Sequence, residues 1–309
     1  MRDNTVHDIT IGMKGRFELV AVKADGSGSR KLAEFDNLIL DSGLDYYCSS
    51  QAASPLSCCR VGAGSTAPNV SQTNLVSQIA ARDGAEASVG SMSSSAPYWF
   101  SRKRTWRFSA GAAAGNIAEV GVGWSTSGDT LFSRALVLDQ NGNPTTVTVL
   151  SDEFLDVTYT LTCYPSADDS RATLTLAGNS YEVVSRIAYA GVVNQFVQPG
   201  QVLTQHPLAG QYSTYFYPGE LGPITGRPSG DAAAVETPTV TPSQYTAGSF
   251  ICEVSMRFGL DSANIVNGIK SMVIQPYSFC QYQIQFTPAV PKTNSQIFTI
   301  RFRLTFTRR

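Results

Sequence analysis

Residues 298–309 read FTIRFRLTFTRR, and this stretch decides the fold. Apolar side chains occupy every second position from Phe298 to Phe306, and threonine or arginine fills the positions between them. Alternation with a period of two over ten residues is typical of a β-strand with one buried face and one exposed face. The C-terminal segment is therefore predicted to be a long strand whose polar face meets solvent or a partner.

The same alternation recurs throughout the chain. Residues 155–163 (LDVTYTLTC) place leucine, valine, tyrosine and cysteine on one face and aspartate or threonine on the other. Turn signals separate several such runs, including Asp25–Gly26, which predicts a hairpin, and Asn141–Gly142. The repeated pattern predicts an all-β protein.

Helical patterns are scarce. The best candidate is a short helix near 73–83, where Thr73 could cap the N-terminus and Gly84 would end the run. Leu75, Val76 and Ile79 would share one face of this helix. A second short turn is possible at 112–119. The expected fold class is all-β, with two β-sandwich-like domains, one or two short helices and a long Pro/Gly/Tyr-rich arm.

The predicted domains are residues 1–165 and 166–309, joined near YPSADDSR. Each half has a similar order of strands, so duplication and chance similarity both remain possible. Within the second domain, residues 190–248 contain seven prolines, which disfavour regular structure. This segment is too aromatic for a plain linker and is predicted to be an extended arm that packs on a neighbour. Its aromatic residues are Phe196, Tyr212, Tyr215, Phe216, Tyr217 and Tyr245.

Composition narrows the possible functions. Charged residues make up 15% of the chain and the net charge is −1. The chain therefore has no overall positive charge that would attract it to nucleic acid or to an anionic membrane. No apolar run is long enough to span a bilayer, and the N-terminal residues lack the apolar region of a signal peptide. We therefore expect a soluble product that stays in the compartment where it is made.

Six cysteines and two histidines lack the spacing of a zinc site. Reduced, mostly buried thiols are expected, and Cys58–Cys59 is predicted to be the most exposed pair.

The segment 59–75, CRVGAGSTAPNVSQTNL, invites comparison with a phosphate-binding loop. It lacks the lysine of one phosphate-loop pattern and the third glycine of the other, and Pro68 stands where the helix N-terminus should begin. The sequence favours a structural glycine turn that leads into a short helix.

Catalytic patterns are equally weak. Asp152, Glu153 and Asp156, and the pair Asp168–Asp169, lie where solvated turn residues are ordinary, and they lack the spacing of a calcium loop. Neither His7 nor His206 is placed to serve a serine triad. No catalytic, cofactor-binding or metal-binding residue is assigned.

The run SRKRTWRF places basic residues around an aromatic ring. Arg104, Trp106 and Arg107 are candidate interface residues, with Trp106 expected to point inward. An inter-subunit salt-bridge face is favoured over a nucleic-acid groove because the net charge opposes the latter. The arm tyrosines could serve either a protein interface or a sugar-stacking platform.

Five ordered blocks, taken together, resemble virion structural proteins of tailed bacteriophages, of the tail-tip, baseplate or fibre-attachment type. They are FDNLILDSGLD, CRVGAGSTAPNVSQTNLVSQI, TWRFSAGAAAGNIAEVGVGW, FSRALVLDQNGNPTTVTVLSDEFLDVTYTLTCYP and FTIRFRLTFTRR. The resemblance covers roughly residues 9–165 and the last strand, and no block matches the arm. It carries no catalytic residues.

The resemblance implies a non-enzymatic structural component of the virion, located in the phage tail and assembled in the host bacterial cytoplasm. Its expected partners are copies of itself and other tail or baseplate proteins. Two alternatives stay open: a receptor- or carbohydrate-binding module that contacts a host surface glycan, and a head, neck or collar component.

Overall fold

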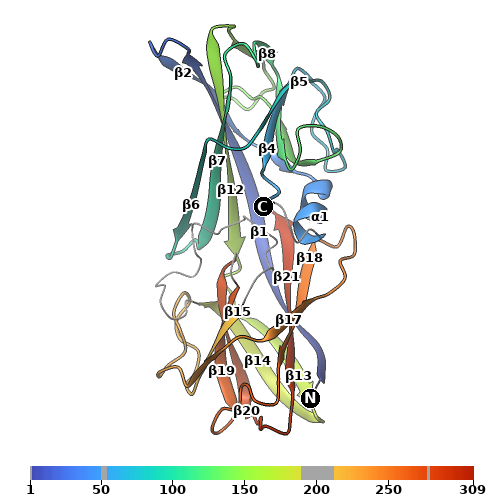
Figure 1. Cartoon of the computed structure of the whole chain (residues 1–309), viewed down its shortest axis with the longest axis vertical. Helices are drawn as coiled ribbons and strands as arrows, with labels where there is room; N and C mark the ends of the chain where they lie inside the picture. Colours follow the sequence, from blue (N-terminus) through green and yellow to red (C-terminus); the bar gives the residue numbers. More distant parts are fainter. Residues whose placement is uncertain (1, 50–53, 189–211, 277–278) are drawn as a thin grey trace.

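The structure is a computed structural model that describes residues 2–49, 54–188, 212–276 and 279–309. Within these residues the chain is nearly all β-structure with one α-helix, α1 (Asp41–Ser49), so the predicted all-β class is confirmed. The molecule is elongated, and its longest strands follow its long axis (Figure 1).

An eight-stranded sheet extends along most of the molecule. Its strands are β1 (Arg2–Lys23), β2 (Ser29–Asp36), β6 (Ala87–Ser93), β7 (Trp99–Phe108), β12 (Glu153–Pro165), β17 (Thr239–Pro242), β18 (Ile251–Phe258) and β21 (Phe298–Arg308). They are ordered β17-β18-β21-β1-β12-β7-β6, with β2 also paired to β1. The first strand of the chain, β1, pairs in parallel with the last strand, β21, and antiparallel with β12. Strands from the two ends of the sequence therefore lie side by side in one sheet. The hydrogen-bonded sheet therefore does not break at residue 165, where the sequence predicts a domain boundary.

Two further sheets cover this shared sheet. The five-stranded sheet has the order β3-β10-β9-β4-β5, with strands β3 (Leu38–Ile39), β4 (Cys58–Gly62), β5 (Gln78–Asp83), β9 (Glu119–Gly123) and β10 (Leu131–Leu136). The six-stranded sheet has the order β13-β14-β20-β19-β15-β16, with strands β13 (Ser170–Leu176), β14 (Asn179–Ala188), β15 (Tyr212–Tyr217), β16 (Ala234–Glu236), β19 (Ile269–Pro276) and β20 (Gln281–Val290). A small pair joins β8 (Gly115–Ile117) and β11 (Val147–Val149).

Aromatic contacts show how the layers pack. The ring of Phe216 on β15 meets that of Phe258 on β18 at 5.4 Å between centroids, and Tyr282 on β20 meets Phe302 on β21 at 5.5 Å. Toward the other end, Trp106 on β7 donates its indole N–H to the carbonyl of Ser57, next to β4, at 3.1 Å. The five-stranded sheet thus covers one end of the shared sheet and the six-stranded sheet covers the other (Figure 1).

The period-two prediction is confirmed in detail. Along β12 every second residue is buried, and along β21 the same holds from Phe298 to Phe306. The hairpin predicted at Asp25–Gly26 joins β1 to β2, and Gly26 adopts the left-handed conformation (φ 75°) that such a turn requires.

The helix predicted near 73–83 is wrong. Residues 78–83 form the edge strand β5, and Val76 and Ile79 are exposed rather than sharing a buried face. The extended conformation prevails because β4, buried at all five positions, needs a hydrogen-bonding neighbour, and β5 supplies it.

Candidate functional site

The glycine-rich segment 62–78 wraps around a buried ion pair between Glu119 and Arg134. Both side chains are fully buried, and Arg134 donates to Glu119 Oε2 at 2.7 and 2.9 Å. The Glu119 carboxylate also accepts the backbone N–H groups of Gly64 (3.0 Å), Val76 (3.1 Å) and Ser77 (2.7 Å). The backbone N–H groups that a bound phosphate would need are thus already hydrogen-bonded to a carboxylate of the protein. The structure therefore favours a structural role for this loop over phosphate binding.

Electrostatics at this pair follow from its contacts. Burial on its own raises the pKa of Glu119, but the amides of Ser77 and Val76 and the Arg134 guanidinium outweigh it, so the pKa is lowered. A side chain at Gly64 would collide with the carboxylate, which explains why glycine is required there. The signal in the sequence is that Glu119 and Arg134 are each the one charged residue of their strand.

Strand β7 carries the three interface candidates from the basic run. Trp106 is fully buried, as expected, and is part of the core rather than of a surface. Arg104 is half-buried and donates to the carbonyl of Leu56, which ties the strand to the loop before β4. Arg107 is exposed but forms a bidentate ion pair with Asp156 of β12, at 2.7 and 2.6 Å. Within the part of the chain that the structure describes, these arginines already have partners in their own subunit.

Strand β6 lies beside β7 and forms one edge of the eight-stranded sheet. It pairs with β7 over seven residues without a register shift, and no strand among the described residues pairs with its other edge. Its sequence, ASVGSMS, contains no charge and no proline, and the side chain of Val89 is 55% exposed. Edge strands usually carry charges, proline or a bulge that prevent pairing with another chain. β6 has none of these, so among the described residues it offers an unpaired backbone edge.

The arm prediction is wrong for the segment that the structure describes. β15 lies inside the six-stranded sheet between β19 and β16, and Phe216 and Tyr217 are buried in the core. These two rings therefore cannot dock on a neighbour or stack on a sugar. Tyr215 is half-buried and packs against the cluster of Ala188, Tyr217 and Val273. Phe196 lies outside the described residues, and Tyr212 is placed only as the first residue of β15.

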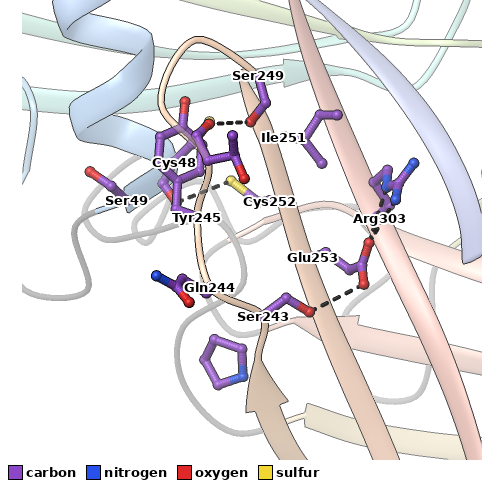
Figure 2. Close-up of a pocket in the computed structure, with 12 residues that line it drawn as sticks. Cys48, Ser49, Ser243, Gln244, Tyr245, Ser249, Ile251, Cys252, Glu253 and Arg303 are labelled. Atoms are coloured by element: carbon purple, nitrogen blue, oxygen red, sulfur yellow. Dashed lines mark hydrogen bonds and ion pairs between the residues drawn. The ribbon is translucent and has the colours of Figure 1, made fainter.

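Tyr245, the last of the arm aromatics, lines a cavity of about 270 Å³ beside the end of α1 (Figure 2). Its hydroxyl donates to Asp45 Oδ1 at 2.5 Å, and Gly248 donates its N–H to the same oxygen at 2.8 Å. On the opposite wall Arg303 pairs with Glu253 at 2.9 Å. The two contacts with Asp45 fasten the strap Ser243–Phe250 to α1, and the Ser243 hydroxyl, which donates to Glu253 at 3.1 Å, fastens it to β18.

The cysteine prediction is partly wrong. All six thiols are buried, as expected, but Cys58 and Cys59 are fully enclosed rather than exposed. Burial raises the pKa of the Cys58 thiol to about 11 and that of Cys59 well above its ordinary value. The thiols that border a cavity are those of Cys48 and Cys252.

Four of the five carboxylates considered for catalysis, those of Asp152, Glu153, Asp156 and Asp169, form ion pairs with basic side chains. Asp152 contacts Lys23 at 3.0 Å, Glu153 contacts Arg30 at 2.8 Å, and Asp169 contacts Arg186 at 2.6 Å. Residues 2–49, 54–188, 212–276 and 279–309 contain no group of three or more His, Cys, Asp or Glu side chains that could hold a metal ion.

Glu153 yields a prediction for pH dependence. The Arg30 side chain and the Leu150 amide lower its pKa from an ordinary 4.5 to about 2. A lowered pKa in the folded state contributes stability that is present above pH 4.5 and is lost as the pH falls toward 2. Glu153→Gln is expected to flatten this fall in the free energy of unfolding, measured by urea titration across that range. Arg30→Gln should flatten it too, and a slope unchanged from wild type in both variants would contradict this assignment.

No family model, curated protein or solved structure matches this chain. No helix in the described part of the chain is long and apolar enough to cross a membrane.

Proposed function

We propose that this chain is a non-enzymatic structural component of a tailed-phage virion, most readily of the tail or baseplate, that assembles by self-association. The ordered sequence blocks support the phage assignment. The observation that carries self-association is the uncharged edge of β6, which no strand in the described part of the chain pairs with.

The occupant we propose for this edge is the β6 strand of a second copy. An extended partner can add to a free edge through backbone hydrogen bonds, and two identical edges pair antiparallel about a two-fold axis. Since β6 carries no charge, no like charges oppose each other in such a pair. Its alanine, serine and glycine side chains permit close approach, and the exposed side chain of Val89 would lose solvent contact.

The first test is the mass of the purified protein, measured by light scattering on a size-exclusion column. We expect a defined oligomer for the wild type and a shift toward monomer for Val89→Lys, because a lysine on an edge strand disfavours pairing with another chain. Val266→Lys is the matched control, since Val266 is 85% exposed and lies outside the strands.

Both variants should unfold within about 0.5 kcal/mol of wild type, as expected of surface substitutions. An oligomer that survives Val89→Lys would place the interface elsewhere on the chain. A wild-type monomer at every concentration would overturn self-association and direct the search to another virion protein.

A further inference from the structure

Four cysteines gather around the buried ring of Tyr47 on α1. Cys48, Cys163, Cys252 and Cys280 all lie close enough to influence its hydroxyl. Cys163 and Cys280 are fully enclosed, and Cys280 contacts the hydroxyl of Tyr282 at 2.9 Å. Cys48 and Cys252 differ from them because both line the cavity beside the strap Ser243–Phe250.

Cys48 and Cys252 come from distant parts of the sequence and meet in space. Cys48 is in the last turn of α1 and Cys252 is the second residue of β18. The Cys252 thiol donates to the backbone carbonyl oxygen of Cys48, with the sulfur 3.9 Å from that oxygen (Figure 2). This contact places the two cysteines next to each other in space, as an intramolecular disulfide requires.

We propose that Cys48 and Cys252 form a modification site: a dithiol that a small disulfide such as oxidised glutathione converts into an intramolecular disulfide. Cys48 and Cys252 line the same cavity as Tyr245, and this cavity gives a small oxidant its route. The bond would join the end of α1 to β18. This proposal does not depend on the proposed function.

The reaction balances without any further reactant. One cysteine thiolate attacks a sulfur of oxidised glutathione, which breaks the glutathione disulfide and releases one glutathione thiolate. The second cysteine thiolate then attacks the protein sulfur of the mixed disulfide and releases the second glutathione. The two cysteine protons end on the two glutathione thiolates, so the protein is oxidised by two electrons and glutathione disulfide is reduced. Burial raises the pKa of Cys252, so the reaction should accelerate as the pH rises.

The test uses the full chain, fully reduced and then exposed to oxidised glutathione without denaturant. The sample is then alkylated, digested and mapped by mass spectrometry. We expect a linked pair of peptides containing Cys48 and Cys252, a protein lighter by two hydrogen atoms, and alkylation of the other four cysteines. The urea midpoint should rise on oxidation because the bond restricts the unfolded chain.

Cys48→Ser and Cys252→Ser should each abolish the linked peptides and the rise in midpoint, whereas Cys58→Ser should retain both. Because the peptide map is made on wild-type protein, it decides the matter even where a serine variant fails to fold. Six free thiols after oxidation, or a bond that joins any other pair, would overturn the proposal.

Discussion

Replacing Glu119 with alanine is expected to lower the free energy of unfolding by about 3–5 kcal/mol, the usual cost of removing one partner from a buried ion pair. The carboxylate is fully buried and pairs with the equally buried Arg134. Its loss leaves an uncompensated guanidinium in the interior. It also removes the acceptor for the N–H groups of Gly64, Val76 and Ser77, which hold segment 62–78 in place.

The measurement is urea unfolding followed by circular dichroism, with Glu86→Ala as the matched control. Glu86 pairs with Arg82 at 2.9 Å, but both side chains are largely exposed, so this loss should cost less than about 1 kcal/mol. A cost for Glu119→Ala no larger than that for Glu86→Ala would mean that the buried pair does not organise the loop.

The parts of the fold that could be predicted from sequence are those in which one side-chain pattern determines the structure. β12 and β21 alternate without interruption, so burial of one face follows from the period alone. The interior ion pair was not predictable in the same way. Glu119 and Arg134 are fifteen residues apart, and only the pairing of β9 with β10 brings them together.

The helix was misplaced because local propensity pointed to the wrong segment. α1 has the sequence DSGLDYYCS, whose glycine and aromatic residues form helices poorly. Gly43 is nonetheless required there, since a Cβ would collide with the backbone of Phe132. Close packing against β10 therefore selects a sequence with weak helical propensity, and packing of this kind leaves no local signal.

The prediction of an arm was wrong because the seven prolines were counted over the whole of residues 190–248, which hid a proline-free strand within it. In the described part, Pro218 directly follows β15, and the six residues YSTYFY contain no proline. Proline here delimits a strand instead of preventing one. Two of the aromatic residues that indicated an interface with a neighbour, Phe216 and Tyr217, in fact face this chain's own core.

Deleting Phe196–Tyr245 is accordingly expected to abolish cooperative folding, not to leave a folded but unassembled subunit. The deletion removes β15 and β16, so β19 loses its neighbour on one side. It also removes the buried rings of Phe216 and Tyr217, which exposes the Phe258 ring on β18. The sheet that covers one end of the molecule would then lack two of its six strands.

A milder pair of variants separates loss of the core from loss of an arm. Phe216→Ala should lower the free energy of unfolding by about 3–5 kcal/mol, the usual cost of truncating a buried phenylalanine. Val235→Ala on β16 should change it by no more than about 0.5 kcal/mol, because Val235 is 56% exposed. If the deletion kept a sharp urea transition and Phe216→Ala matched Val235→Ala, the segment would be an appendage. We expect instead that Phe216→Ala destabilises the protein far more than Val235→Ala does. That result would show that β15 belongs to the folded core, and any assembly through β6 depends on that core.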